Sequence, residues 1–416
     1  MKSYQYLIVG GGIAGGRAID GIRKLDQKGT VALVTRDAHP PYQKPPLSKG
    51  YLVGTEGLDQ LYLKDVVYYE QNQVDLFIGS AAIHLDRVAH TVTLNNGEAI
   101  SYKKLLLATG AIPFRLPLPG ADLERVWTLR TIEDSDSLRN AAKGGGPAVV
   151  LGGSFIGAEV AAALSSIGMD VTMVFPESRL LARVCPPELS AFIAERFVSQ
   201  GIRLLSGQRP ERLVGTGQVE RVILDNGDAL PANQVVMGVG VRPDTALAKE
   251  AGLELDEKGG VVVDEHLTTS DPDIYAAGDI AAWPDPTSGR RIRVEHWDVA
   301  RQQGIRAGRN MAGEGKPYGA VPYFYSDLLG YSLEGWGDLT GWDAMVRRGR
   351  VGDAQFSFYS FKEGKLAGVL FVNPSNADRK TLAALVKAKP NQSDVATDLA
   401  DETKELGSLL APETER

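Results

Sequence analysis

The sequence predicts an α/β protein with two Rossmann-like three-layer domains and a C-terminal α+β domain. Three observations predict this class: a strand, glycine turn and helix at the N-terminus, a repeat of that unit further along the chain, and aromatic and β-branched runs after Pro322. The chain has 416 residues, of which 43% are hydrophobic, and this is enough for two or three domains with ordinary cores.

The first unit begins with an apolar run at residues 6–9 that leads into a G-x-G-x-x-G pattern formed by Gly10, Gly12 and Gly15. The first glycine makes the tight turn, the second leaves room for a dinucleotide pyrophosphate, and the third lets the helix pack against the strand. Residues 17–25 then favour a helix and residues 31–34 a second parallel strand. Asp37 follows that strand, where an acid for the ribose hydroxyls is expected, although an ordinary surface loop explains it equally well.

The rest of the first segment predicts a loop, a hairpin and a buried strand. Residues 40–52 are too rich in proline to be helical before Leu47, so we expect a rigid loop there. Asn-Asn-Gly at residues 95–97 marks a hairpin turn, and residues 105–110 are typical of a buried strand that ends in small residues.

Residues 148–157 repeat the strand, glycine turn and helix, and this repeat predicts a second dinucleotide site. Ser154 stands at the middle glycine position, so the pyrophosphate there has to tolerate a small side chain. A helix over residues 158–168 and a strand over residues 171–174 complete the unit.

The later segments predict further elements in order. Residues 186–200 favour an amphipathic helix, Asn-Gly at residues 226–227 a second hairpin, and residues 235–243 one buried strand. A strand over residues 270–279 ends in Gly278 and Asp279, and that carboxylate either faces a ligand or caps a helix. The C-terminal domain is expected to close with a helix over residues 377–387.

Charge and cysteine content exclude several classes of protein. A net charge of −7 argues against nucleic-acid binding, which needs a basic face. Seven acidic and two basic residues lie between Asp394 and Arg416, so we expect a solvated tail or an exposed helix there. The single cysteine, Cys185, excludes an intramolecular disulfide and fits a reducing compartment, and we expect no metal site.

The hydropathy of the chain predicts no membrane span, because no segment approaches the roughly 18 apolar residues that a span needs. The first strand also begins within a few residues of Met1, which leaves no room for a signal peptide. We therefore expect a cytoplasmic protein.

In these motifs the chain resembles the FAD-dependent pyridine nucleotide-disulfide oxidoreductase superfamily. It is most similar to the branch that contains ferredoxin reductases, monodehydroascorbate reductases and apoptosis-inducing factor. Six motifs in one order carry the resemblance: GGGIAG from Gly10, PYQKPPLSKGYL from Pro41, LLLATGA from Leu105, GGSFIGAE from Gly152, GVGVRPD from Gly238 and IYAAGDIA from Ile274. The resemblance implies an FAD-binding domain of residues 1–112 and 245–322, an inserted NAD(P)H-binding domain of residues 113–244, and a C-terminal interface domain of residues 323–416 with an acidic tail.

The resemblance also implies which residues bind the cofactors, with FAD held non-covalently. The implied set is Gly10, Gly12, Ala14, Gly15, Asp37, Lys44, Lys49, Ala108, Thr109, Gly110, Gly152, Gly153, Phe155, Ile156, Gly157, Glu159, Glu177, Gly240, Gly278, Asp279 and Trp297.

Three of these residues are the expected catalytic ones. Lys49 and Glu159 resemble an ion pair beside flavin N5, and Trp297 resembles an aromatic residue that faces the flavin or the nicotinamide. From the sequence alone, a loop lysine and a glutamate near a helix N-terminus are the better interpretations of Lys49 and Glu159, and only the resemblance raises them. For Trp297, a packed core tryptophan is nearly as good an interpretation.

Two further positions bear on how the nucleotides are held. Lys44 stands where much of the branch has arginine, so a bidentate pyrophosphate contact is expected to be lost. Glu177 follows Phe-Pro, as in monodehydroascorbate reductases and apoptosis-inducing factor, where the glutamate takes the adenosine ribose hydroxyls. NADH is therefore expected to be preferred over NADPH, although Arg179 and Arg183 nearby would suit a 2′-phosphate.

The implied reaction is hydride transfer from NADH to FAD, followed by departure of the electrons directly from the flavin edge. The early loops lack the paired cysteines of disulfide reductases, and Cys185 is expected to be structural. A ferredoxin-type iron–sulfur carrier is the leading acceptor. The alternatives are a small radical or quinone, or a role as a redox-gated interaction protein. Basic clusters at residues 290–293 and 347–350 are solvated faces or docking sites for an acidic ferredoxin, and we expect a monomer or homodimer.

Overall fold

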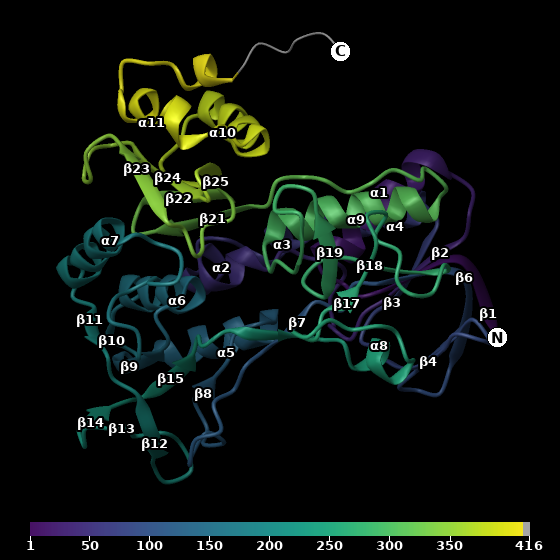
Figure 1. Cartoon of the computed structure of the whole chain (residues 1–416). Helices are drawn as coiled ribbons and strands as arrows, with labels where there is room; N and C mark the ends of the chain where they lie inside the picture. The colour runs from purple at the N-terminus through teal and green to yellow at the C-terminus, as the bar shows by residue number, and fades with distance from the viewer. Residues whose placement is uncertain (411–416) are drawn as a thin grey trace. The chain divides into compact units, whose positions relative to one another are not determined.

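In the computed structural model, which describes residues 1–410, the chain divides into two units (Figure 1). The first unit comprises Met1–Pro46, Glu56–Ile112 and Val241–Ala320. The second comprises Leu47–Thr55, Pro113–Gly240 and the described chain from Val321 onward.

A mixed sheet organises the first unit. Its strands run in the order β3 (Val74–Phe77), β2 (Val31–Val34), β1 (Lys2–Val9), β6 (Ala99–Leu107), β5 (Thr91–Leu94) and β4 (Ala82–Asp86), and β18 (Ile274–Ala276) also pairs with β6. The pairs among β1, β2, β3, β6 and β18 are parallel, whereas β4, β5 and β6 pair antiparallel. The predicted turn at residues 95–97 joins β5 to β6. Apolar side chains of β1, β2 and β6 are buried and form the core of this unit.

Two helices of the first unit, α1 (Ile13–Leu25) and α9 (Trp297–Met311), pack side by side (Figure 1). A Cβ atom on Gly304 would lie 2.2 Å from the Ala14 carbonyl oxygen, and one on Gly308 would lie 2.1 Å from the Ala18 carbonyl oxygen. Because only glycine fits at such distances, the small residues of α9 set how closely it approaches the helix of the first glycine turn.

The smaller elements of the first unit surround this framework. They are α3 (Leu58–Leu61), α4 (Val66–Gln71), α8 (Ala246–Glu250) and a sheet of β17 (Val261–Val262), β19 (Ala281–Asp285) and β20 (Arg290–Ile292).

The second unit contains a parallel sheet that repeats the first motif. Its strands run in the order β11 (Arg203–Ser206), β10 (Met169–Phe175), β9 (Gly146–Leu151), β15 (Gln234–Met237) and β8 (Val126–Trp127). The accompanying helices are α5 (Ile132–Ala142), α6 (Phe155–Ser166) and α7 (Pro187–Ser199), and β12 (Pro210–Val214), β13 (Arg221–Leu224) and β14 (Ala229–Pro231) form a small antiparallel sheet. The order β9, α6, β10 matches β1, α1, β2, so the predicted repeat is confirmed.

The single strand predicted over residues 235–243 is two strands in the structure. β15 ends at Met237 in the parallel sheet, and β16 (Val241–Pro243) pairs with β7 (Ala111–Pro113). The apolar run is continuous across the break and hydrophobicity does not reveal it. Gly240 allows the break, because its φ of 107° is a conformation that other residues rarely adopt.

The C-terminal part of the second unit is an antiparallel sheet with helices beside it (Figure 1). Its strands run in the order β21 (Tyr323–Leu328), β22 (Tyr331–Gly337), β25 (Lys365–Val372), β24 (Phe356–Lys362) and β23 (Ala344–Arg348), with helices α10 (Asn376–Ala388) and α11 (Gln392–Ala400) and a 3-10 turn η2 (Leu406–Leu409). The predicted helix over residues 377–387 is α10, which begins with a capping box of Ser375 and Asp378.

The acidic end is more than a solvated tail. Val395 and Leu399 of α11 are buried in the C-terminal core, while the polar positions of the helix face solvent. Residues 411–416 of the predicted tail lie outside the described residues.

The proline-rich loop contains a 3-10 turn, η1 (Pro45–Ser48), and its first α-helical turn, α2 (Gly50–Val53), follows Leu47 as expected. Together with the two sheets of parallel strands and the C-terminal sheet, the structure confirms the predicted fold class. Among residues 1–410, no helix combines the length and the apolar composition that crossing a membrane requires.

Candidate functional site

In the first glycine turn, backbone atoms crowd Gly10 and Gly15, whereas the space beside Gly12 is open. Gly10 has a φ of 129°, and a Cβ atom there would lie 2.0 Å from the Ala108 carbonyl oxygen. A Cβ atom on Gly15 would lie 1.9 Å from the Gly10 carbonyl oxygen. By contrast, no atom of residues 1–410 lies within 4 Å of a Cβ atom on Gly12, which precedes α1. Open space at a helix N-terminus that a Cβ atom would occupy fits a dinucleotide pyrophosphate.

Asp37 and Lys44 form an ion pair near the end of β2. The Lys44 Nζ atom lies 2.9 Å from Asp37 Oδ2 and donates to the Tyr42 hydroxyl at 2.6 Å. Burial opposes ionisation of Asp37, but the charge of Lys44 and its hydrogen bond outweigh this effect and keep the pKa of Asp37 below its ordinary value. Asp37 is therefore a charged hydrogen-bond acceptor at the position where a residue that binds the ribose is expected, and the Lys44 ammonium group is engaged with this carboxylate.

The turn at Ala108, Thr109 and Gly110 is fixed by a residue that the sequence did not single out. Asp244 accepts from Thr109 Oγ1 through its carbonyl oxygen at 2.5 Å, and its own N–H group donates to the Gly110 carbonyl at 2.9 Å. Its carboxylate pairs with Arg36 at 3.0 Å. The RPD segment thus fastens this turn beside Gly10.

The turn at Gly278 and Asp279 lies against the first glycine unit. A Cβ atom on Gly278 would lie 3.1 Å from the Ala14 Cβ atom. The Gly278 N–H group donates to Oε1 of the buried Gln303 at 2.9 Å, and Arg293 donates to the Asp279 carbonyl at 3.0 Å. The chain then enters β19, so the alternative that Asp279 caps a helix is wrong.

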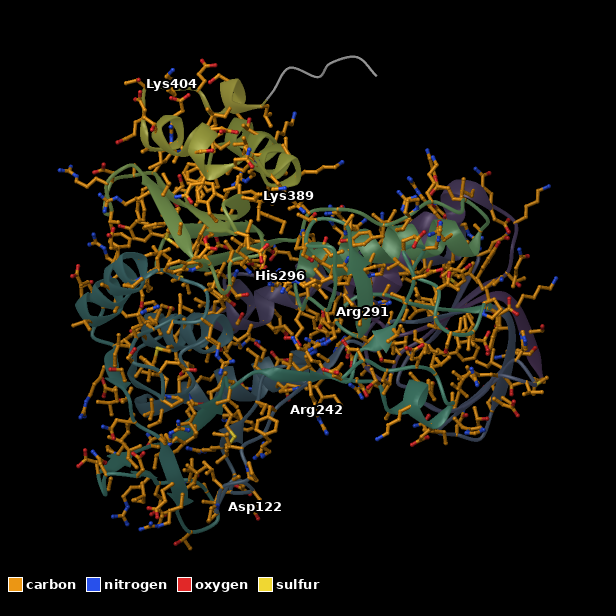
Figure 2. The ribbon with its side chains drawn as sticks, viewed as in Figure 1. Asp122, Arg242, Arg291, His296, Lys389 and Lys404 are labelled. Carbon is orange, nitrogen blue, oxygen red and sulfur yellow. The ribbon has the colours of Figure 1, made fainter. Side chains whose placement is uncertain are left out.

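Two arginines of the basic cluster at residues 290–293 donate to backbone carbonyls at this turn and near it. Arg291 donates to the carbonyl groups of Val263 and Ala282 at 2.6 Å each, and Arg293 also pairs with Glu295 at 2.5 Å. Figure 2 labels Arg291 together with His296. The guanidinium groups of Arg291 and Arg293 are held within the unit.

Trp297 begins α9, immediately after His296. Its half-buried ring packs against the core of the first unit, with the Arg301 guanidinium carbon 5.9 Å from the ring centroid. Burial lowers the pKa of His296 to about 4, and the nearby Asp279 carboxylate opposes that shift.

We expect acid to destabilise the protein partly through His296. The imidazole stays neutral in the native state down to a pH of about 4, but the unfolded chain takes up this proton near pH 6.5. The contribution of the neutral His296 side chain to the free energy of unfolding is therefore fully present above pH 6.5 and is lost as the pH falls towards 4. His296→Gln should reduce the acid-induced fall in melting temperature by a few degrees, about 4 °C, which thermal unfolding across this pH window measures. An equal fall in both proteins would contradict the prediction.

The second glycine turn repeats the geometry of the first. Gly152 has a φ of 116°, and a Cβ atom there would lie 2.3 Å from the Gly238 carbonyl oxygen. A Cβ atom on Gly157 would lie 2.3 Å from the Gly152 carbonyl oxygen. Ser154 Oγ donates to the Gly238 carbonyl at 2.8 Å, so the hydroxyl that replaces a glycine is tied to the protein.

The remaining predicted residues of this turn lie around it in the second unit. A Cβ atom on Gly153 would lie 2.8 Å from the Phe175 ring, and no described residue comes within 4 Å of one on Gly240. The Phe155 ring lies 5.1 Å from that of Phe324, and Ile156 is 46% exposed.

Glu177 lies just beyond β10, where the second ribose acid is expected. Its carboxylate pairs with Arg183 at 3.4 Å, and the Arg183 side chain is 86% exposed. Arg179 donates to the Ala182 carbonyl at 3.4 Å. The acid and an exposed guanidinium group paired with it thus lie together at this position.

Cys185 is buried in the core of the second unit. Burial raises the pKa of its thiol to about 12, with Arg179 opposing only in part. A thiol that stays protonated and out of solvent is a structural residue.

Lys49 and Glu159 come together within the second unit. The Lys49 Nζ atom lies 3.4 Å from Glu159 Oε1, and the carboxylate is buried. Glu159 also accepts from Ser48 Oγ at 2.5 Å and from Ser326 Oγ at 2.6 Å. Neither serine was predicted as a site residue, because the contacts join segments that are far apart in the chain.

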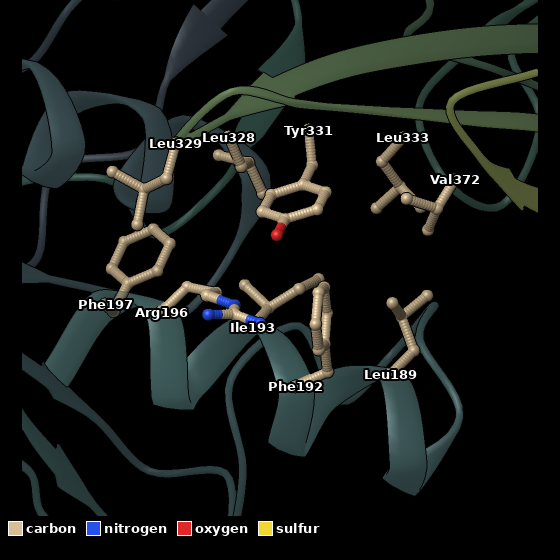
Figure 3. Close-up of a pocket in the computed structure, with 10 residues that line it drawn as sticks. All are labelled: Leu189, Phe192, Ile193, Arg196, Phe197, Leu328, Leu329, Tyr331, Leu333 and Val372. Carbon is tan, nitrogen blue, oxygen red and sulfur yellow. The ribbon is translucent and has the colours of Figure 1, made fainter. Parts of the chain in front are cut away.

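An apolar cavity in the second unit lies between α7 and the β21–β22 hairpin (Figure 3). Its lining residues are Leu189, Phe192, Ile193, Arg196, Phe197, Leu328, Leu329, Tyr331, Leu333 and Val372. The cavity measures about 10 Å³, which leaves room for about one water molecule. It is a gap in side-chain packing and no nucleotide site.

The second basic cluster, at residues 347–350, is also engaged within its unit. Arg347 pairs with Glu188 at 2.5 Å and Arg350 with Asp353 at 3.1 Å. Arg348 donates to backbone carbonyls that follow α11, including that of Asp401 at 2.6 Å. This arginine anchors the C-terminal segment.

Comparison with known proteins agrees with this geometry. The profile of the pyridine nucleotide-disulphide oxidoreductases matches residues 4–304, and a profile described as reductase C-terminal matches residues 323–410. The chain is 36% identical to rhodocoxin reductase of Rhodococcus erythropolis, over 93% of this chain and 91% of that protein. It is 35% identical to monodehydroascorbate reductase 3 of Arabidopsis thaliana, over 94% of each. Among solved structures, the covalent putidaredoxin reductase–putidaredoxin complex matches with a TM-score of 0.92 and 30% identity over 98% of each chain.

Proposed function

The chain belongs to the pyridine nucleotide-disulphide oxidoreductase family, and from that membership we propose that it is an FAD-dependent NAD(P)H reductase that passes electrons to a small iron–sulfur carrier. The observation that carries the proposal is the pair of glycine turns, each closed by backbone carbonyls on one side. The first has open space at Gly12, where a pyrophosphate would bind, and in the second the Ser154 hydroxyl is tied back to the Gly238 carbonyl. The similarity to rhodocoxin reductase and to the reductase of the putidaredoxin reductase–putidaredoxin complex supports this kind of acceptor.

We assign FAD to the first glycine turn and NAD(P)H to the second. Residues 1–112 and 245–322 are then the FAD-binding domain, residues 113–244 the NAD(P)H-binding domain, and residues 323–416 the interface domain. The Gly12 turn takes the FAD pyrophosphate, Asp37 the adenosine ribose, and Asp279 the ribityl and phosphate portion. When bound, FAD supplies the hydride and electron chemistry, and the residues of the chain bind and orient it.

Trp297 is proposed to face the flavin or the nicotinamide. Lys49 is proposed to act on the cofactor as a cation that favours its electron-rich reduced form, with Glu159 as the paired carboxylate. The distance of 3.4 Å between Lys49 Nζ and the buried Glu159 carboxylate supports this pairing.

For the second nucleotide we propose NADH over NADPH. Glu177 offers a carboxylate to the ribose diol and repels a 2′-phosphate, and its pairing with Arg183 keeps the nearest exposed cation neutralised.

Glu177→Ala should reduce the preference for NADH by about tenfold, which corresponds to about 1.4 kcal/mol. The substitution removes the repulsion and releases Arg183 to meet a 2′-phosphate. Stopped-flow rates of flavin reduction by both nucleotides measure the ratio. Arg183→Ala is the matched control and should keep the preference for NADH. NADPH favoured by the unaltered protein would remove Glu177 from this role and point to Arg183.

The proposed acceptor can be tested with purified protein under anaerobic conditions. We expect the protein to be yellow, to be reduced by NADH and to pass electrons to a [2Fe–2S] ferredoxin and to ferricyanide, but not to glutathione disulfide. Cys185→Ser should retain this activity, because the buried thiol has no partner thiol in the sequence. A folded, colourless protein that FAD cannot reconstitute would end the proposal, and loss of turnover in Cys185→Ser would overturn the direct transfer of electrons.

Reduction of a small radical or quinone is the second candidate, because the chain is also similar to a monodehydroascorbate reductase along its length. Faster NADH turnover with monodehydroascorbate than with the ferredoxin would favour it. We further propose a monomer or homodimer in the cytoplasm, a reducing compartment that suits one unpaired buried cysteine.

A further inference from the structure

The buried carboxylate of Glu159 does not depend on Lys49 for its hydrogen bonds. Ser48 Oγ donates to Oε2 at 2.5 Å and Ser326 Oγ to Oε1 at 2.6 Å, and both serines are buried. Hydrogen bonds to a carboxylate at these distances are strong. The Lys49 Nζ atom, at 3.4 Å from Oε1, is the more distant partner of an oxygen that Ser326 already occupies.

Lys49 has a second carboxylate within reach. Its Nζ atom lies 3.3 Å from Asp327 Oδ2, and it lies 4.9 Å from the centroid of the Tyr325 ring. The side chain of Asp327 is 55% exposed, whereas that of Glu159 is 6% exposed. The Lys49 ammonium group therefore lies at nearly equal distances from a buried and a solvent-exposed carboxylate, beside an aromatic ring whose face attracts cations.

The cost of moving this ammonium group is low. Removing the cation from a buried ion pair normally leaves a stranded charge, which is strongly destabilising. Here the two serine hydroxyls continue to solvate Glu159 when Lys49 withdraws. Asp327 holds the ammonium group at the solvent edge, where the pair itself is weak.

We propose that Ser48, Ser326 and Asp327 are positioning residues that make Lys49 a movable cation, with its ammonium group exchanging between Glu159 and Asp327. This inference rests on the proposed function for the purpose of the movement. With the ammonium group at Glu159, the electron-rich reduced cofactor is stabilised. With the ammonium group at Asp327 that stabilisation weakens, which favours passing electrons on.

The exchange can be measured without turnover. The purified full-length protein is acetylated with a water-soluble N-hydroxysuccinimide ester, in the absence of nucleotide substrate, and the modification rate of Lys49 is followed by peptide mass spectrometry. The ester reacts with the neutral amine of the lysine and releases N-hydroxysuccinimide. Asp327→Asn should slow acetylation by about threefold, because Lys49 is then confined to the buried Glu159, where the ester reaches it less often. Ser326→Ala should also slow it, because Oε1 of Glu159 then binds Lys49 more closely. Glu159→Gln should accelerate it.

This pattern separates positioning from simple packing. If the cluster only packed, all three substitutions would loosen it and accelerate acetylation, and that result, or an unchanged rate in Asp327→Asn, would overturn the proposal. Asp398→Asn is the matched control, since Asp398 is another exposed carboxylate beside a lysine, 3.8 Å from Lys404. It should leave the rate at Lys49 unchanged. If Glu159→Gln fails to fold, the exposed Asp327→Asn decides alone.

The link to the redox cycle has its own readout. Asp327→Asn should raise the flavin midpoint potential, because the cation is then confined to Glu159. An unchanged potential would overturn the role of the movement in the redox cycle while leaving reductase activity intact. A chain that binds no FAD would instead overturn the proposed function and leave the acetylation pattern as predicted.

Discussion

Gly12→Val should give a folded protein that has lost FAD. Within the described part of the chain, nothing lies within 4 Å of a Cβ atom at Gly12, and its φ of −84° and ψ of −172° are extended values that suit valine. The fold therefore has no reason to change. The added methyl groups occupy the space at the N-terminus of α1 where the pyrophosphate is proposed to bind, so we expect affinity for FAD to fall by about a thousandfold, or about 4 kcal/mol.

The flavin absorbance of the purified variant and titration of the apoprotein with FAD measure this loss, and circular dichroism checks the fold. Gly144→Val is the matched control, because the nearest atom to a Cβ atom there is 4.0 Å away in a loop outside both glycine turns. It should retain FAD. Wild-type affinity for FAD in Gly12→Val would show that the first turn does not hold the pyrophosphate.

The glycine turns were predictable because their requirements are local. A positive φ at Gly10 and a close approach at Gly15 are demands on single residues between a strand and a helix, and the sequence shows them directly. The repeat at Gly152 and Gly157 obeys the same demands with the same spacing. The fold class followed from these turns and from the hydrophobic pattern of the strands.

The surroundings of the site were not predictable in the same way. Ser48 and Ser326 contact Glu159 across 111 and 167 residues of sequence, and a lone serine in a 3-10 turn or a strand carries no signal of such a contact. Gln303 and Arg293 likewise hold the turn at Gly278 through tertiary packing. The pairing of Lys49 with Glu159 was expected only from the family resemblance, because neither residue stands in a pattern that requires it.

Lys49→Met should slow the NADH-dependent loss of flavin absorbance by about a hundredfold, the typical cost of removing one group that stabilises developing charge. Methionine keeps the length of the side chain and removes the cation. The protein should still fold, because Ser48 and Ser326 continue to donate to Glu159.

The same substitution should lower the flavin midpoint potential by about 30 mV or more, since 30 mV corresponds to tenfold in a two-electron equilibrium. Without the cation, the reduced cofactor loses the charge that favours it. If Lys49 and Glu159 act as one unit, the effects of Lys49→Met and Glu159→Gln on rate and potential should not add in the double variant. Such non-additivity is expected of residues in direct contact. Lys404→Met, which removes an exposed lysine paired with Asp398, is the control and should change neither rate nor potential. Unchanged rate and potential in both single variants would make Lys49 and Glu159 an ordinary structural ion pair, and the assignment of the cation in this family member would have to pass to another residue.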